Sequence, residues 1–286
     1  MRIILLKRLK MNTDKVPDTK LKGIKLIVAD LDGTLLKSDK SLDDNIKDVI
    51  SGQDYKFTIA SGRSMVLVKN FISELNIDLP YITNNGAEIY QSDACVKQYS
   101  IPDEEVRFIL NLVQEFDLEC HANAENCIYT MGKIDLILPF RKRFEGVLPI
   151  VDNASIHEVC ANTINKIMCI DKDLNKVQEF ANKINLYCEH VHCERAEGNA
   201  FVMVNRQASK GKALKNLIEL LHISSEEVIV FGDNYNDVSM FEAVKYSVCM
   251  ENADKDVKDK ATFICKSNDM NGVSDFIQKY INSGWR

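Results

Sequence analysis

Short apolar runs alternate with amphipathic segments at both ends of the chain. Runs at residues 26–29, 57–60 and 81–82 predict buried strands, and segments 41–50 and 64–75 predict the helices between them. The last third repeats the alternation, with helices expected at 211–221, 236–243, 254–260 and 272–281 and strands at 228–231, 247–250 and 262–264. Strands that alternate with helices form a parallel sheet, so both ends predict one α/β core domain, doubly wound and Rossmann-like.

The middle of the chain follows a different pattern. Apolar and polar residues alternate along its strands, which is typical of a sheet with one solvated face. The expected elements are a hairpin at 88–90 and 96–99, helices at 104–116 and 174–184, and strands at 118–122, 128–130, 164–170, 186–193 and 201–205. We therefore predict an α+β cap domain at 88–197, inserted between the core segments 22–87 and 198–286, and a poorly ordered extension at 1–21.

Composition narrows the class of protein. The 286 residues are 45% hydrophobic, which suits two domains, and the net charge of -6 without a clustered basic face argues against nucleic-acid binding. No apolar run approaches the roughly 18 residues that span a bilayer. The nine cysteines lack regular spacing, which is typical of reduced thiols. We expect a cytoplasmic protein without a membrane partner, as a monomer or a homodimer.

Two carboxylates follow the first predicted strand. Asp30 and Asp32 lie in the segment DLDGTL, directly after the apolar run 26–29. An Asp at the end of a parallel strand faces the ligand crevice, and Gly33 permits a sharp turn that brings the second Asp to the same place. This spacing suits a nucleophile beside a general acid and base. The alternative is a plain surface turn, because Asp-Gly is common in hairpins.

A second acidic segment, GDNYND, follows the predicted strand 228–231 and supplies Asp233 and Asp237. Parallel strands end at the same sheet edge, so these carboxylates are expected to meet the first pair. Gathering so many carboxylates would raise their pKa values unless a cation neutralised them. Oxygen ligands favour Mg²⁺. The alternative is an acidic helix start that the helix dipole stabilises.

Two smaller features complete the pattern. Ser61 and Gly62 follow the strand 57–60 and offer a hydroxyl and backbone N–H groups to an anion. Ser61 as an ordinary N-cap is the alternative. Lys210 opens the helix 211–221, where a cation is unfavourable unless it has an anionic partner.

These four features, in this order, resemble the haloacid dehalogenase (HAD) superfamily of phosphohydrolases. The long segment between Ser61 and Lys210 places the cap as in class II members, with a IIB-like cap. Further segments resemble the Cof-type subfamily, namely NNGA at 84–87, SKG at 209–211, MENA at 250–253 and SND at 267–269. The resemblance covers about residues 23–281.

The resemblance implies a magnesium-dependent phosphatase that hydrolyses small phosphomonoesters such as sugar phosphates, pyridoxal phosphate or nucleotides. It implies that Asp30 attacks phosphorus to form an aspartyl-phosphate, and that Asp32 protonates the leaving alcohol and then activates water. Implied metal ligands are Asp30, the backbone carbonyl of Asp32, and Asp233, with Asp237 behind them. Implied phosphate-binding groups are Ser61, Gly62, Lys210 and Asn236, and Asn85 is placed on the substrate side.

Some alternatives stay open from sequence. A phosphomutase, or a catalytically silent binding protein on the same scaffold, would carry the same motifs. Cap residues such as Asn123, Glu125 and His192 are candidates for substrate specificity. Cys188, His190 and His192 would share one face of a predicted strand, which makes a zinc site conceivable, but reduced cysteines beside solvated histidines are the favoured interpretation.

Overall fold

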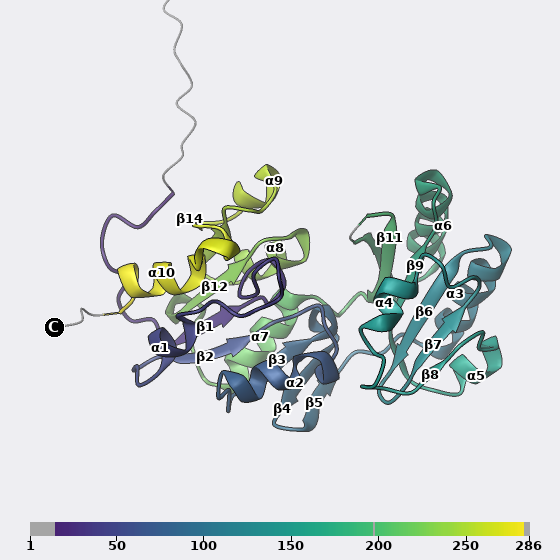
Figure 1. The fold of residues 1–286 in the computed structure, drawn as a ribbon, viewed down its shortest axis with the longest axis horizontal. Helices are drawn as coiled ribbons and strands as arrows, with labels where there is room; N and C mark the ends of the chain where they lie inside the picture. The colour runs from purple at the N-terminus through teal and green to yellow at the C-terminus, as the bar shows by residue number, and fades with distance from the viewer. Residues whose placement is uncertain (1–14, 197, 283–286) are drawn as a thin grey trace, which may run out of the picture.

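The structure, a computed structural model, describes residues 15–196 and 198–282, which form a core domain and a cap domain (Figure 1). The core sheet has five strands in the order β14-β13-β12-β1-β2, and every neighbouring pair is parallel. The strands are β1 (Leu26–Ala29), β2 (Lys56–Ile59), β12 (Val228–Gly232), β13 (Tyr246–Met250) and β14 (Phe263–Cys265). This arrangement confirms the predicted α/β class.

Helices cover both faces of this sheet because successive residues of each strand point to opposite sides. Ile27 and Ile229 join one apolar cluster with α1, α2 and α10, while Leu26 and Val230 join another with α7, α8 and α9. The helices are α1 (Ile46–Ile50), α2 (Met65–Glu74), α7 (Lys210–Leu220), α8 (Val238–Phe241), α9 (Lys255–Lys258) and α10 (Gly272–Tyr280). The strands are therefore buried on both sides, as their continuous apolar runs predict.

The cap is built on a six-stranded sheet in the order β10-β11-β9-β6-β7-β8, antiparallel except for the parallel pair β7 and β8. Its strands are β6 (Glu119–Ala124), β7 (Ile128–Met131), β8 (Ile150–Val151), β9 (Ile164–Ile170), β10 (Val191–Arg195) and β11 (Ala200–Asn205). Helices α3 (Asp103–Glu115), α5 (Ile156–Cys160) and α6 (Leu174–Tyr187) pack on one face. Helix α4 (Leu138–Lys142) lies toward the core domain (Figure 1).

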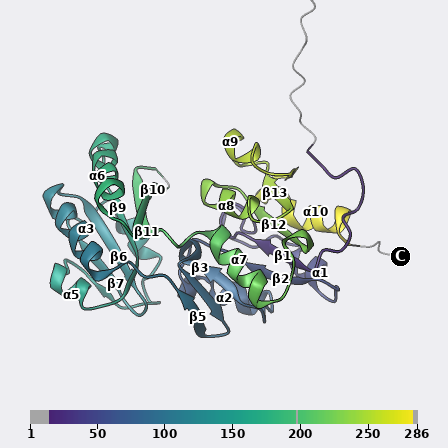
Figure 2. The ribbon, with the colours of Figure 1, turned by 180° about the vertical axis from the view of Figure 1, so that it is seen from behind.

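The domain boundaries differ from the predicted ones. Strands β4 (Glu88–Gln91) and β5 (Ala94–Gln98) pair with the core strand β3 (Tyr81–Thr83), so this hairpin belongs to the core (Figure 2). Strand β11, which was assigned to the core, pairs with β9 and β10 of the cap. The strand with which each strand pairs decides to which domain it belongs, and that partner can be distant in sequence.

Three other predictions need correction. The strand expected at 186–193 is wrong because α6 continues to Tyr187 and β10 begins only at Val191. The helix expected at 41–50 is shortened to α1, since a turn precedes it in which Ser41 donates to the carboxylate of Asp39. Helices α4 and α5 and strand β8 were not predicted.

The predicted extension at 1–21 lies outside the described residues up to position 14. Residues 15–21 pack against the core: Ile264 N donates to Lys15 O at 2.7 Å, and Leu21 N donates to Tyr280 O at 2.8 Å. The Lys15 ammonium also donates to the carbonyls of Lys258, the last residue of α9, and Ala261, which follows that helix. Within the described ranges, no helix has both the length and the apolar character to cross a bilayer.

Candidate active site

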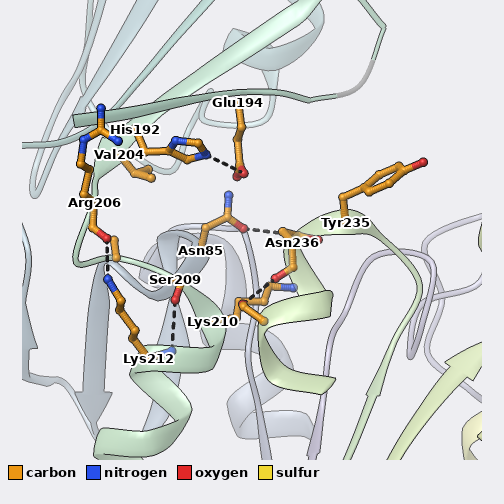
Figure 3. A pocket seen from close by; sticks show the side chains of 12 residues that line it. Asn85, His192, Glu194, Val204, Arg206, Ser209, Lys210, Lys212, Tyr235 and Asn236 are labelled. Atoms are coloured by element: carbon orange, nitrogen blue, oxygen red, sulfur yellow. Dashed lines mark hydrogen bonds and ion pairs between the residues drawn. The ribbon is translucent and has the colours of Figure 1, made fainter. Parts of the chain in front are cut away.

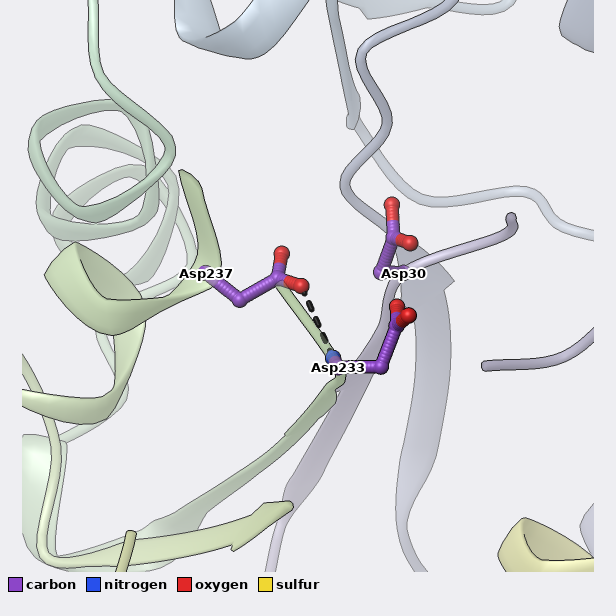
Figure 4. Close-up of side chains that lie close together, drawn as sticks. All are labelled: Asp30, Asp233 and Asp237. Atoms are coloured by element: carbon purple, nitrogen blue, oxygen red, sulfur yellow. Dashed lines mark hydrogen bonds between the residues drawn. The ribbon is translucent and has the colours of Figure 1, made fainter. Parts of the chain in front are cut away.

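Three carboxylates meet at the carboxyl edge of the core sheet (Figure 4). Asp30 follows β1 and Asp233 follows β12, and these strands are neighbours in register, with Ala29 opposite Phe231. Asp237 ends the short 3-10 helix η3 (Tyr235–Asp237). One carboxylate oxygen from each of Asp30, Asp233 and Asp237 lies within 4.8 Å of the other two. The two acidic motifs therefore form one site.

Lys210, the first residue of α7, lies beneath this cluster and is almost fully buried. Its ammonium donates to Asp30 Oδ1 and to Asp237 Oδ1, both at 2.6 Å. Burial opposes the charge of this ammonium, but Asp237 and Asp30 outweigh it and raise the pKa of Lys210. The anionic partner that the sequence demanded for Lys210 is thus supplied by the protein itself.

The cluster carries more negative than positive charge. Burial, reinforced by the nearby Asp237, raises the pKa of Asp233 to about 7, against the hydrogen bond from Thr34. Burial likewise raises the pKa of Asp30, although Lys210 acts in the opposite sense. Three carboxylates thus share one ammonium. Such a group of hard oxygen donors fits a divalent cation such as Mg²⁺.

Asp237 differs from the other two carboxylates because its oxygens are already occupied. Oδ1 accepts from Lys210, and Oδ2 accepts from the backbone N–H groups of Asp233 at 2.9 Å and Asn234 at 3.0 Å. These bonds hold the loop after β12 in shape. Asp30 and Asp233 are the better placed to bind a cation.

Asp32 lies at the mouth of the site, with its side chain 41% exposed. The Arg63 guanidinium donates two hydrogen bonds to this carboxylate, from Nε to Oδ2 at 2.6 Å and from Nη2 to Oδ1 at 2.7 Å. The Lys40 ammonium also donates to Asp32 Oδ1, at 3.1 Å. Burial alone would raise the pKa of Asp32, but Arg63 and Lys40 lower it to about 2. In this arrangement Asp32 is an ionised carboxylate.

The turn after Asp32 positions Asp233. Gly33 has φ +79°, and a Cβ built there would lie 2.2 Å from Asp233 Oδ2, so the position requires glycine. Thr34 Oγ1 donates to Asp233 Oδ1 at 3.0 Å, and Asn252 Nδ2 donates to the Gly33 carbonyl at 2.9 Å. Thr34 of the DLDGTL segment and Asn252 of the MENA segment therefore both contact Asp233.

Ser61 and Gly62 form a loop before α2 instead of the start of the helix. The N-cap of α2 is Ser64, so Ser61 is not an N-cap. Ser61 is buried, and its amide donates to Ile82 O while its Oγ accepts from the Arg63 amide at 3.1 Å. The sequence had suggested that this amide would be free to bind an anion, but in the structure it is not free. A Cβ at Gly62 would lie 2.8 Å from Asn85 Oδ1, so the Asn85 side chain would have to shift if Gly62 were replaced.

Asn85 and Asn236 join the loops on either side of the site. Asn85 lies in the left-handed region with φ +58°, and its Oδ1 accepts from Asn236 Nδ2 at 2.9 Å. Asn236 Oδ1 is buried without a hydrogen-bond partner in the described chain. Figure 3 shows both side chains between the start of α7 and the cap strands β10 and β11. Within the described residues, Asn236 thus retains an unused acceptor beside Lys210.

Two cavities open between cap and core at this point. One, of about 460 Å³, is drawn in Figure 3 and is lined by Asn85, His192, Glu194, Lys210, Tyr235 and Asn236, among others. The other, of about 520 Å³, is lined from the core by Asp32, Lys40, Arg63 and Asn85 and from the cap by His121, Asn123, Arg143 and Lys166, among others. The site is therefore reached between the two domains.

The three cap residues proposed to set substrate specificity lie in different places in the structure. Asn123 lines the larger cavity and His192 the smaller one, whereas Glu125 lines neither of them. The conceivable zinc site is not formed among the described residues, because Cys188 ends α6, His190 contacts Glu105 and His192 contacts Glu194. The three side chains do not share a strand face.

Several contacting residues were not assigned from sequence. Thr34 and Asn252 each lie inside a recognised motif, and Arg63 directly follows Ser61 and Gly62, so these segments were the available signal. Lys40 contacts Asp32 from the following loop, and Lys166 reaches the Gly62 carbonyl from the cap at 3.2 Å. No local pattern marks these two lysines.

Comparison with known proteins gives consistent matches over nearly the whole chain. A sequence model described as haloacid dehalogenase-like hydrolase matches residues 27–277. The chain is 28% identical to the 5-amino-6-(5-phospho-D-ribitylamino)uracil phosphatase of Bacillus subtilis, covering 91% of this chain and 99% of that protein. It is 27% identical to the pyridoxal phosphate phosphatase of Escherichia coli, covering 90% and 98%.

Solved structures share the fold. A haloacid dehalogenase-like hydrolase from Bacteroides thetaiotaomicron superposes with a TM-score of 0.78 at 26% identity, covering 89% of this chain and 98% of that chain. A sugar phosphatase of HAD subclass IIB superposes with a TM-score of 0.77 at 24% identity, covering 88% and 97%. The inserted cap is thus part of the shared architecture.

Proposed function

The chain belongs to the haloacid dehalogenase-like hydrolase family, and we propose that it is a magnesium-dependent phosphatase of small phosphomonoesters that works through an aspartyl-phosphate on Asp30. The relatives named above are phosphatases of small phosphorylated compounds. The observation that carries the proposal is the convergence of Asp30, Asp233 and Asp237 around one buried lysine.

Asp30 is the nucleophile in this proposal. It stands at the end of β1, where a ligand in the crevice meets the strand. Lys210 lies 2.6 Å from Asp30 Oδ1 and brings positive charge to the place where phosphoryl oxygens gather negative charge. Phosphoryl transfer needs mainly positioning and charge stabilisation, which this pair supplies.

Asp30, Asp233 and the backbone carbonyl of Asp32 would hold Mg²⁺. Their fit rests on the surplus of carboxylate over ammonium charge in the cluster. When bound, the ion supplies positive charge that allows an anionic carboxylate to approach an anionic phosphate. Asp237 keeps Lys210 and the loop after β12 in place.

Asp32 is the general acid and base, and Arg63 governs when it acts. The bidentate contact holds Asp32 ionised, so protonation of the leaving alcohol requires the guanidinium to turn away. An arriving phosphate is a competing bidentate partner for Arg63. Ser61, Gly62 and Asn236 bind the phosphoryl oxygens, Asn236 through the second N–H of its side-chain amide, while Asn85 accepts from the first N–H and holds Asn236 at the substrate side.

The test is phosphate release from a panel of sugar phosphates, nucleotides and pyridoxal phosphate, with and without Mg²⁺. We expect Mg²⁺-dependent hydrolysis and a fall in kcat of about a thousandfold or more in Asp30→Asn. The exposed Asp39→Asn is the control. A silent binding protein would release no phosphate with any member of the panel. A phosphomutase would return an isomerised sugar phosphate.

A further inference from the structure

The larger cavity between the domains is rich in positive charge. Among the described residues that line it, the cations are Lys40, Arg63, Arg143 and Lys166, and the carboxylate is Asp32. Both oxygens of Asp32 already accept from Arg63, and one also accepts from Lys40. The cap adds Lys166 to this cavity, and Asp32 does not contact its ammonium.

Lys166 carries most of this argument. It lies on β9, and within the described chain its ammonium makes one hydrogen bond, to the neutral Gly62 carbonyl at 3.2 Å. An ammonium has three donors, and a partly buried one is costly without an anionic partner. Burial, helped by the nearby Arg143, lowers the pKa of Lys166 to about 8, while Glu88 acts in the opposite sense.

Glu88 is not that partner, because its oxygens are engaged elsewhere. Oε2 accepts from Thr83 Oγ1 at 2.8 Å and Asn84 Nδ2 at 2.9 Å, and Oε1 accepts from Asn165 Nδ2 at 2.5 Å. This buried network ties the cap strand β9 to the core strand β4 at the hinge. It fixes the residue next to Lys166 and so directs β9 toward the core.

The remaining walls suit an organic group that carries a hydroxyl. Arg143 lies over the Phe140 ring, 5.0 Å from its centroid, and both line the cavity. Burial, with the charge of Lys166, lowers the pKa of His121 to about 3, so its ring is neutral. His121 Nδ1 lies 2.7 Å from Asn123 Oδ1 and donates to it, which leaves Nε2 as an acceptor for a hydroxyl.

We propose that the substrate is a phosphomonoester whose leaving group carries a second anionic group, a phosphate or a carboxylate, together with a free hydroxyl. Lys166 and Arg143 of the cap bind the second anion, and His121 accepts from the hydroxyl. This proposal rests on the phosphatase function proposed above and names the substrate class of the same site.

Matched substrate pairs test it directly. We compare kcat/KM for 3-phosphoglycerate with glycerol 3-phosphate, and for fructose 1,6-bisphosphate with fructose 6-phosphate. The first pair probes a carboxylate and the second a phosphate. We expect the wild-type enzyme to prefer the doubly anionic member of at least one pair by about tenfold or more, the size of one charged hydrogen bond. This comparison needs no variant.

Lys166→Met removes the charge and keeps an unbranched side chain that is one atom shorter. It should lower kcat/KM by about 10- to 100-fold on the preferred doubly anionic substrate and by less than about threefold on the counterpart that lacks the second anionic group. Lys166→Arg should keep the preference, and Lys172→Met, at an exposed cap position, should behave as the wild type.

Each contrary outcome has a separate meaning. Absence of any preference in the wild type overturns the proposed substrate class. An equal loss on both members of a pair in Lys166→Met also overturns it, because the lysine would then bind the transferred phosphoryl group. Both results leave the phosphatase function standing. If no substrate is turned over in the presence of Mg²⁺, the proposed function is wrong, and so is the inference that rests on it.

Discussion

At the scale of single residues, the site depends on charges that are buried together. Lys210 is 1% exposed and Asp237 is fully buried, and both bonds to the lysine are 2.6 Å long. A buried ion pair contributes little net stability, but removing one partner is costly because the other charge stays buried. The triad of Lys210, Asp30 and Asp237 is therefore a weak source of stability and a strong constraint.

Lys210→Met should leave two carboxylates without their cation. We expect it to lower the free energy of unfolding by about 3–5 kcal/mol, and Mg²⁺ should restore part of this loss. Urea denaturation with and without Mg²⁺ measures both effects. Lys212→Met, on the same helix but bound to surface carbonyl groups, is the control. A variant as stable as the wild type in the absence of Mg²⁺ would contradict the triad.

Arg63→Gln should change how stability depends on pH. The pKa of Asp32 is lowered to about 2 in the fold, against about 3.9 in the unfolded chain. The contribution of Asp32 to stability is thus present above about pH 4 and is lost as the pH falls toward about 2. The wild type should exceed Arg63→Gln in urea midpoint at neutral pH, and this difference should shrink on acidification.

Arg63 also lies over the Phe71 ring at 5.4 Å, and loss of that contact does not depend on pH. The diagnostic quantity is therefore the change in the difference between the two proteins, with the exposed cap variant Arg107→Gln as the control. A difference that stays constant from neutral pH to about pH 2.5 would show that Arg63 does not hold Asp32 ionised.

At the scale of elements, strand ends and the turns after them place the chemistry. β1 and β12 are parallel neighbours, so Asp30 and Asp233 leave the sheet side by side. The turn at Gly33 then folds back against Asp233, with no room for a side chain. The 3-10 helix η3 returns Asp237 to the same point.

Gly33→Ala should displace Asp233. Gly23→Ala is a matched control, because Gly23 has a similar φ of +76° but no atom within 4 Å of an added Cβ. Both variants bear the backbone strain of about 1 kcal/mol. Only Gly33→Ala should lose activity, by about a hundredfold in kcat, since a shift of about 1 Å in a reacting group has that effect. Equal activity in the two variants would show that the turn at Gly33 does not position Asp233 for catalysis.

At the scale of the whole molecule, the cap domain and the core domain each have apolar clusters of their own. The cap has its own cluster under α3, α5 and α6, and the core has clusters on both faces of its parallel sheet. Two connections join the domains (Figure 2), and the Asn205 side chain donates to the Ser100 carbonyl at 2.7 Å to tie them together. Buried polar contacts, such as the bond from Asn165 to Glu88, also cross between the cap and the core domain.

Calorimetry should resolve two unfolding transitions, because each domain has its own core. Mg²⁺ should raise the Tm of one transition only, since the ion binds the folded core domain. Asp233→Asn should abolish that shift without moving the cap transition. A single transition that Mg²⁺ shifts as a whole would mean that the domains unfold together.

Much of the fold followed from local pattern. The strand at 164–170 was predicted with the boundaries that β9 has, and the polar residues Thr163 and Asp171 flank it. Helices α4 and α5 were missed because each has five residues, too short for a periodic signal. The predicted domain boundaries were misplaced because sheet pairing assigns β5 to the core domain and β11 to the cap.

By itself, the sequence determined that Asp30 and Asp233 would meet, because parallel strands bring their carboxyl ends to one edge whatever the loops between them do. Only the tertiary structure decided that Arg63 binds Asp32 and that Lys166 reaches Gly62 from the cap. Those contacts depend on how loops and domains pack. Side-chain reach across a domain interface has no period along the chain, so no local pattern encodes it.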